Sequence, residues 1–380
     1  MPKKSRRDRA SAPADRHASS SELTQWIPAA SLALYSFLYL LIYFQSPLPV
    51  YRQQPADRLT VLFTILGNYD TVLATWADLL IDPLPFFAQR TPILLATIFL
   101  FGMAVLIGRF LLGRIGLRSL FTRLETFVLA AALGMATLSL WTFLVGFAGF
   151  LHSPIIIAAP LVLLAAAGLF DWYRQSPVAD ETKGELQPAT PWAWIAAALP
   201  IVACTLLGGM MPPYEYDVLE YHLQLPTEWL ASGRIAVESH NAYSGLPMAA
   251  EMFALLPMTL WPSDQAWFVG ALIGKTLISL FAPLTALAAY CASKRVAGSY
   301  AGQIAAVLVI GTPWIVFVAV YGLVDGVWAF YGLAAVFVAI VWFQQSAAQD
   351  SANVSDRVRL ALLIGLTAGM ATACKYPALP

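Results

Sequence analysis

One stretch of the chain concentrates the side chains that could do acid–base chemistry. It runs from Pro212 to Pro247 and is polar, aromatic and acidic, between two long apolar blocks. A carboxylate here could take the proton from a hydroxyl group, if it comes within about 3 Å of that proton. A second carboxylate could hold a divalent cation, or a phosphate through that cation. The titratable side chains of this stretch are Glu215, Asp217, Glu220, His222, Glu228, Glu238 and His240.

Asp217 and Glu220 are the strongest candidates in this stretch. They begin the pattern DVLEYHLQL, and their spacing of three places both on one face of a helix. The same spacing suits a helix cap, in which Asp217 accepts from a backbone N–H and Glu220 reaches back. His222 and His240 could be metal ligands, although histidines of a polar loop are more often hydrogen-bonded or at the surface. The sequence leaves both pairs of interpretations open.

Two further charged residues lie in or beside apolar runs. Asp325, in VYGLVDGVWAF, could form a tight turn with the glycine that follows it. It could also be a functional carboxylate, as acids near membrane spans often are. Lys275, in FVGALIGKTLISL, could extend its ammonium group to the membrane surface or contact an anion such as a lipid phosphate.

The composition predicts the elements that must position these residues. The chain is 59% hydrophobic and 12% charged, whereas soluble domains carry roughly 25% charged residues. We expect an all-α polytopic membrane protein, with about nine transmembrane helices and a helical extracytoplasmic loop. Zero net charge and the lack of a basic domain argue against nucleic acid as a partner. Cys204, Cys291 and Cys374 lack disulfide or zinc spacing, and we expect them to be small buried side chains.

The apolar runs also predict the organisation of the chain. The expected spans are 27–44, 91–112, 127–145, 155–170, 192–207, 266–289, 301–320, 324–343 and 360–374. Lys and Arg residues before the first span place the N-terminus in the cytoplasm. Between spans, we expect 59–66 to be too short to cross, 69–80 to lie on the surface, and Trp229, Trp261 and Trp267 to anchor at the interface. The predicted parts are 1–25, a disordered basic tail; 26–172, N-terminal membrane helices; 173–191, a cytoplasmic linker; and 192–380, a membrane module with the extracytoplasmic loop 208–265.

Several strings within about residues 190–380 resemble, in the same order, motifs of one enzyme family. They are PYEYDVLEYHL at 213–223, WLASGRI at 229–235, HNAYSGLP at 240–247, YGLVDG at 321–326 and GLTAGMATACKYP at 365–377. The family is the membrane glycosyltransferases of the family-C fold (GT-C), near the dolichyl-phosphate-mannose-protein mannosyltransferase and aminoarabinose transferase-like group. The chain differs from that family in placing about five spans before the loop and in lacking its adjacent Asp-Glu pair.

The resemblance implies a sugar transferase of a bacterial inner (plasma) membrane. Its donor would be a polyprenyl-phosphate-linked sugar, and its acceptor a lipid, polysaccharide or protein at the extracytoplasmic face. Asp217 would be the base with Glu220 as its neighbour, and the candidate cofactor is a divalent cation. A membrane transporter and a non-enzymatic membrane assembly protein are the alternatives. The implied substrate-binding residues are Tyr221, His222, Arg234, His240, Asp325, Lys275, Lys375 and Tyr376.

Overall fold

The structure, a computed structural model, describes most of the chain beyond residue 83. The described residues are 31, 34–42, 45, 58–71, 74, 84–174, 192–261, 263–347 and 354–376. The chain divides into two units, Met1–Pro85 and Phe86–Pro380. The first unit contains α2 (Arg58–Gly67), a ten-residue helix too short to cross a membrane. Of the predicted span 27–44, residues 31 and 34–42 are described, and all of them are helical. The predicted surface helix 69–80 lies largely outside the described residues.

The second unit is a bundle of long apolar helices. Within the described residues, six helices are long and apolar enough to cross a membrane, which confirms the prediction of an all-helical polytopic membrane protein. They are Pro85–Ile115, Arg123–Phe147, Pro154–Arg174, Ala266–Ile310, Asp325–Ser346 and Val354–Cys374. The elements of this unit are α4 (Leu84–Ile115), α5 (Arg123–Phe147), α6 (Pro154–Arg174), α7 (Trp192–Gly209), α10 (Ala266–Ser279), α11 (Phe281–Ile310), α12 (Pro313–Tyr321), α13 (Asp325–Ala347) and α14 (Val354–Cys374).

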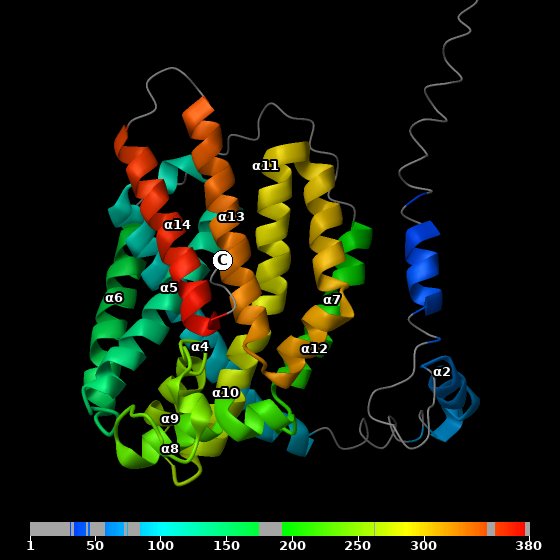
Figure 1. Cartoon of the computed structure of the whole chain (residues 1–380), viewed down its shortest axis with the longest axis horizontal. Coiled ribbons are helices and arrows are strands. Elements are labelled where there is room, and N and C mark those ends of the chain that lie inside the picture. The colour runs from blue at the N-terminus through cyan, green and yellow to red at the C-terminus, as the bar shows by residue number, and fades with distance from the viewer. Residues whose placement is uncertain are drawn as a thin grey trace, which may run out of the picture. The chain divides into compact units, whose positions relative to one another are not determined.

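The longest of these, Ala266–Ile310, does not run straight. Its 45 residues would extend about 67 Å as one rod, about twice the thickness of a bilayer core. The backbone leaves helical geometry at Ala297 and at Gly298, where φ is +85°, a conformation that suits glycine. Figure 1 shows α11 turning back at this point and continuing into α12. The chain thus reverses between the predicted spans 266–289 and 301–320.

Close packing of small residues joins α4 to α5. An added Cβ at Gly134 would lie 1.7 Å from the carbonyl oxygen of Ala104, and one at Gly108 would lie 1.8 Å from that of Ala130. Each helix therefore carries an Ala-xxx-Gly pair that faces the other helix. Helices in a membrane associate through such close backbone approach, because burial of apolar surface gives them little driving force in lipid.

An ion pair ties the helices together at the end of the bundle where α5 begins. The guanidinium of Arg295 on α11 donates to both carboxylate oxygens of Glu125 at 2.6 Å, and to the carbonyl of Leu120 at 2.8 Å. Glu125 also caps α5, accepting from the backbone N–H of Thr122. Arg118 pairs with Asp171 of α6 at this end. The Arg118 pKa is lowered by burial, with the Asp171 charge opposing that shift.

The opposite end of the bundle is covered by the segment that follows α7. It contains the irregular helix η3 (Val218–His222), then α8 (Gln224–Ser232), η4 (Ala242–Gly245) and α9 (Met252–Leu260). Figure 1 shows this segment at the end where α14 stops and α12 turns into α13. Residues 252–258 of α9 are all buried, so this part of the predicted loop 208–265 enters the bundle.

We predict that Gly134→Val separates α4 from α5 and destabilises the fold. The valine side chain would meet a backbone carbonyl that cannot move aside, so we expect a loss of about 3 kcal/mol or more in the free energy of unfolding, the upper range for overpacking. Unfolding of the purified protein in detergent measures it. The matched control is Gly332→Val on α13, where an added Cβ meets no atom within 4 Å. Equal destabilisation by both variants would contradict the packing role.

Candidate functional site

A buried histidine–carboxylate pair lies where η3 meets the start of α9. The Nδ1 atom of His222 is 2.5 Å from Oε1 of Glu251, and both residues are buried. Beside an ionised carboxylate Nδ1 carries the proton, which leaves Nε2 of the ring as an acceptor. The second oxygen of Glu251, Oε2, is buried and has no hydrogen-bond partner among the described residues. The pair therefore offers one basic nitrogen and one uncommitted carboxylate oxygen.

A second charge pair brings together two residues that the sequence places 50 positions apart. The ammonium group of Lys375, just beyond α14, donates to both carboxylate oxygens of Asp325 at 2.9 and 3.0 Å. Asp325 is the first residue of α13, and the preceding turn is made by Gly322 at φ +82°. Because both side chains are partly exposed, the pair adds little to stability and can take part in binding.

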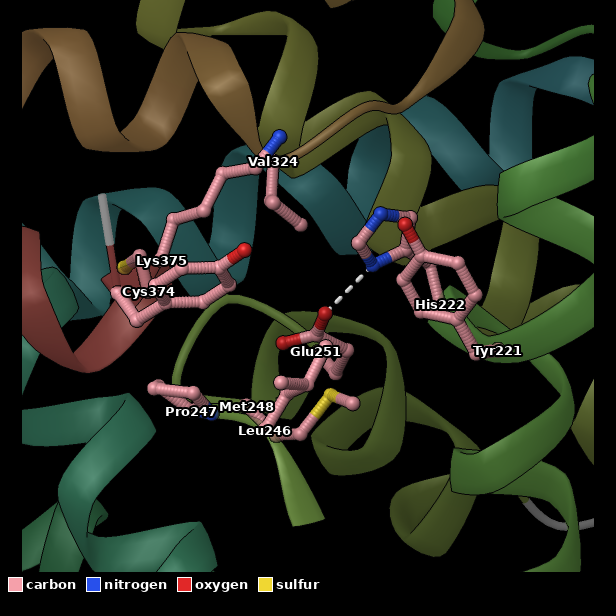
Figure 2. A pocket seen from close by; sticks show the side chains of 10 residues that line it. Tyr221, His222, Leu246, Pro247, Met248, Glu251, Val324, Cys374 and Lys375 are labelled. Atoms are coloured by element: carbon pink, nitrogen blue, oxygen red, sulfur yellow. Dashed lines mark hydrogen bonds and ion pairs between the residues drawn. The ribbon is translucent and has the colours of Figure 1, made fainter. Parts of the chain in front are cut away.

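These two pairs border one cavity. It has a volume of about 40 Å³, enough for a few water molecules, and is lined by residues from three segments. Figure 2 shows Lys375 on one side, His222 on the other and Glu251 between them. The lining residues are Tyr221, His222, Leu246, Pro247, Met248, Glu251, Val324, Cys374, Lys375 and Tyr376. The structure thus brings together Tyr221, His222, Lys375 and Tyr376 from the predicted set, with Asp325 held beside Lys375.

Tyr221 is positioned as a hydrogen-bond donor at this cavity. Its ring stacks on that of Tyr243, with the centroids 4.3 Å apart. Burial raises the pKa of Tyr221 well above its usual value, and the charge of Asp217 raises it further. The phenol therefore stays protonated at neutral pH. Asp217, a half-buried residue, is placed to act on Tyr221, and its role as base stays a prediction.

The capping interpretation of Asp217 and Glu220 is wrong. The side chain of Asp217 makes no cap, and the backbone N–H of Val218 donates instead to Oε2 of Glu215 at 3.1 Å. The side chain of Glu220 is exposed, while its carbonyl accepts from Asn241 at 3.1 Å. A short carboxylate and a π-helical turn do not give the geometry of a capping box, which needs a regular α-helix.

The remaining predicted residues lie elsewhere. Arg234 is exposed and follows Gly233 near the turn between α5 and α6. His240 is exposed and pairs with Glu228 at 3.1 Å. Lys275 is only 2% exposed, with its aliphatic stem against Gly322, so the prediction that it extends to the membrane surface is wrong.

Two other expectations also need correction. Trp229 is buried and donates from Nε1 to the carbonyl of Ala236 at 2.8 Å, so it is a core residue of the segment and not an interfacial anchor. Cys291 and Cys374 are buried as expected, but Cys204 is exposed on α7. The apolar sequence around Cys204 could not distinguish a core-facing from an outward-facing position.

Two apolar grooves lie beside this cavity. The first, about 490 Å³, shares Leu246, Pro247 and Met248 with it. The second, about 680 Å³, shares Leu140 and Ala373 with the first and extends along α14 as far as Arg359. Exposed apolar side chains such as Leu362 and Phe143 border these grooves, so they open onto the apolar surface of the bundle.

Glu251 is the residue that sequence reasoning missed. It is the single acid in the run LPMAAEMFALLPM at 246–258, which falls within the predicted extracytoplasmic loop 208–265. The available signal was a lone carboxylate in an apolar run, the pattern that marks intramembrane acids as functional candidates. The helix after it has only nine residues and gives no span-length signal.

Comparison with known proteins gives no relative. No family model matches the sequence, and no match is found among the curated proteins or the solved structures. The likeness to membrane glycosyltransferases rests on the sequence motifs alone. The function is therefore proposed from the geometry of the cavity.

We predict a pH-dependent contact between this segment and α12. The hydroxyl of Tyr214 hydrogen-bonds that of Tyr321, which raises the pKa of Tyr214 to about 12. Because the neutral phenol is the bonded form, the stabilisation is complete below pH 10 and is lost as the pH rises through about 12. In Tyr321→Phe we expect the Tyr214 pKa to fall toward 10, as read from tyrosinate absorbance. Tyr216→Phe is the control, and a high-pH phase that persists in Tyr321→Phe would contradict the contact.

Proposed function

We propose that this protein is a membrane glycosyltransferase that moves a sugar from a polyprenyl-phosphate-linked donor to an acceptor hydroxyl at the extracytoplasmic face. The observation that carries the proposal is a buried His222–Glu251 pair at a cavity that shares its wall with an apolar groove. Acid–base groups beside a lipid-accessible groove suit a reaction on the head of a lipid. The acceptor would be a lipid, a polysaccharide or a protein.

In this proposal the His222–Glu251 pair is the acid–base machinery. Nε2 of His222 takes the proton of the acceptor hydroxyl while the oxygen of that hydroxyl bonds to the anomeric carbon of the sugar. The bond between the anomeric carbon and the phosphate oxygen of the donor breaks in the same step. Glu251 orients the ring through Nδ1 and stabilises the imidazolium that forms. Of the carboxylates in the predicted site, Asp217 is half-buried and Glu220 exposed, so Glu251 is better shielded from water than either.

Lys375 supports the departure of the carrier lipid. Its ammonium group lies at the rim of the cavity, where Asp325 fixes its position. The site holds two carboxylates against this one ammonium, so a leaving phosphate also benefits from the imidazolium at His222. The uncommitted Oε2 of Glu251 is the atom available to a divalent cation, the candidate cofactor.

The membrane placement is also part of the proposal. The chain would cross a bacterial inner membrane about nine times, with the N-terminus in the cytoplasm and the cavity outside. The ion pairs of Arg118 and Arg295 lie at the end of the bundle away from the cavity, in line with an excess of basic residues on the cytoplasmic side.

We predict that Glu251→Gln and His222→Asn each lower kcat for sugar transfer by roughly 10²- to 10⁴-fold, the usual contribution of a positioned base. The assay measures label released from polyprenyl-phosphate-linked sugars supplied to membranes that contain the protein. Unfolding temperatures check the fold, and the exposed Asp264→Asn should transfer at the wild-type rate. If Asp217→Asn lost sugar transfer while Glu251→Gln retained it, Asp217 would be the base in place of the His222–Glu251 pair. Transfer at the wild-type rate in all three site variants would overturn this assignment of the acid–base residues. Wild-type membranes that release no more label than membranes without the protein would end the glycosyltransferase proposal.

We predict that the groove along α14 receives the polyprenyl chain. Gly365 and Gly369 line it, and an added Cβ at either meets no atom within 4 Å, so a leucine there fills the groove without displacing the protein. Gly369→Leu should raise KM for the lipid-linked donor by tenfold or more, since it excludes several buried methylene groups worth about 0.8 kcal/mol each. Gly332→Leu on α13 also points into open space and is the control. An unchanged KM in Gly369→Leu would remove the lipid chain from this groove.

A further inference from the structure

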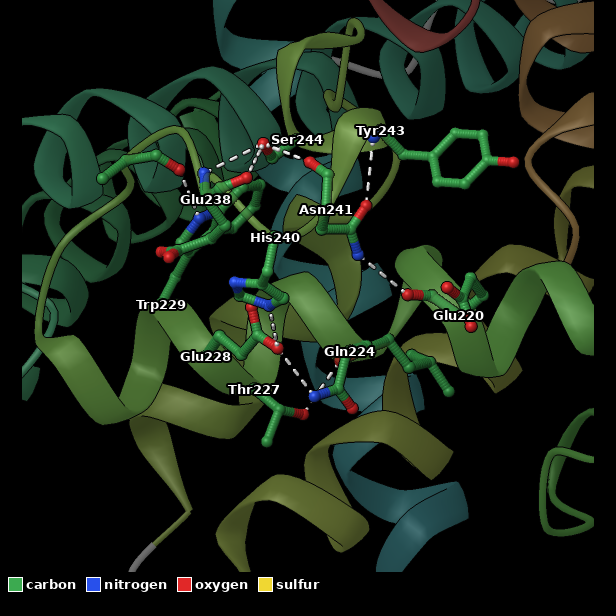
Figure 3. A network of polar contacts seen from close by, with 12 residues as sticks. Glu220, Gln224, Thr227, Glu228, Trp229, Glu238, His240, Asn241, Tyr243 and Ser244 are labelled. Carbon is green, nitrogen blue, oxygen red and sulfur yellow. Dashed lines mark hydrogen bonds and ion pairs between the residues drawn. The ribbon is translucent and has the colours of Figure 1, made fainter.

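A second cluster of titratable side chains lies in the same segment but outside the cavity. Glu228 on α8, with Glu238 and His240 on the chain that returns from it, places three ligand-type atoms within 4.8 Å of one another. The return begins at Gly233, where φ is +76° and α8 ends. Figure 3 shows the contact between His240 and Glu228 within this network.

The cluster has unbalanced negative charge. Oε1 of Glu228 accepts from Gln224 at 2.8 Å and lies 3.1 Å from Nε2 of His240. Oε2 of the same carboxylate is buried and has no hydrogen-bond partner in the described part of the chain. Across those residues no lysine or arginine pairs with Glu228 or Glu238. A buried carboxylate oxygen without a donor is unfavourable, and a bound cation would supply the missing partner.

The surrounding contacts hold the ligands in place. Ser244, which is buried, accepts from the backbone N–H of Glu238 at 2.9 Å and contacts its carbonyl oxygen at 3.2 Å. Trp229 fixes the carbonyl of Ala236. Both ends of the ligand-bearing turn are therefore fixed before any ion binds, which is the role of outer-shell contacts in metal sites.

We propose that Glu228, Glu238 and His240 bind one divalent transition-metal ion, of the Zn²⁺ or Mn²⁺ type. An imidazole with two carboxylates suits these ions, whereas Ca²⁺ and Mg²⁺ prefer oxygen ligands alone. His240 is exposed, so water completes the coordination. Asn241, next to His240, donates to the carbonyl of Glu220 in η3, the helix that carries His222. The ion would therefore order the segment that covers the cavity, without itself touching the cavity.

The test is a titration of the full-length protein, purified in detergent and stripped with a chelator, with Zn²⁺ alone. We expect a saturable Zn²⁺ site that Mg²⁺ does not occupy and that remains in Glu251→Gln, together with a Zn²⁺-dependent rise in the unfolding temperature. Glu238→Gln and His240→Ala should each weaken binding at least about tenfold and abolish that rise. Their unfolding temperature in chelator should equal that of the wild type, because their loss matters only when the ion is bound. Ser244→Ala, which keeps all three ligands, should weaken binding about tenfold.

Two carboxylate variants serve as controls. Asp264→Asn, an exposed acid at the same end, and Glu251→Gln, in the cavity, should both bind Zn²⁺ as the wild type does. Equal affinity in the wild type and in a Glu238→Gln, His240→Ala double variant would overturn the proposal. Loss of binding in Glu251→Gln alone would overturn it too, because the ion would then lie in the cavity. Since the readout is metal binding, the result is independent of the proposed sugar transfer.

Discussion

The arrangement of the cavity depends on the burial of one carboxylate. Glu251 is 2% exposed and lies at the start of a helix whose next seven residues are buried. An ionised carboxylate is costly in such surroundings unless it is paired, and His222 is the partner that the fold supplies. Pairing requires η3 to reach over the start of α9, which brings Tyr221 and the segment around Asp217 to the cavity as well. The pair therefore joins the start of this segment, at η3, to its end at α9.

Small residues make this burial possible. An added Cβ at Gly270 would lie 2.5 Å from Met258, and one at Gly274 would lie 2.5 Å from Ala254, so α10 and α9 touch through their backbones. The entry to α9 is also fixed from two sides. Ser139 of α5 donates to the carbonyl of Ala249 at 2.6 Å, and the N–H of Ala249 donates to Ala373 of α14 at 3.0 Å. Through that last bond the end of α14, and with it Lys375, is set relative to Glu251.

The sequence predicts those parts of the site that follow from polarity at the ends of apolar runs. Asp325 stands out because it lies between two apolar runs, and His222 because it belongs to the polar stretch that follows one. Lys375 is implied only by the resemblance to the transferase motifs. The pairing of Asp325 with Lys375 could not be predicted from the sequence, because it depends on α13 and α14 being antiparallel neighbours. The burial of Lys275 could not be predicted from the sequence either. Its helix is apolar on every side, so no periodicity identifies the face that is buried.

The other parts of the site lie on short or irregular helices, which sequence patterns do not reveal. A window long enough to detect a membrane span averages α9 with the polar residues before it, and so Glu251 was counted with a loop. The helix that begins near Asp217 is π-helical, which changes the side-chain directions that a spacing of three implies. Local pattern rules assume regular α-geometry, and they fail where the backbone departs from it.

In the proposed transfer reaction, the cavity would divide the chemistry between a buried pair and a partly exposed pair. The His222–Glu251 pair is buried, and its atoms are fixed by helices that pack through their backbones. The Asp325–Lys375 pair is partly exposed and lies at the ends of two helices. Proton transfer needs a fixed distance, whereas capture and release of a charged lipid head needs a group that can exchange partners. The buried His222–Glu251 pair and the more accessible Lys375 would meet both needs of the proposed reaction, because Lys375 could exchange Asp325 for a phosphate without disturbing the buried pair.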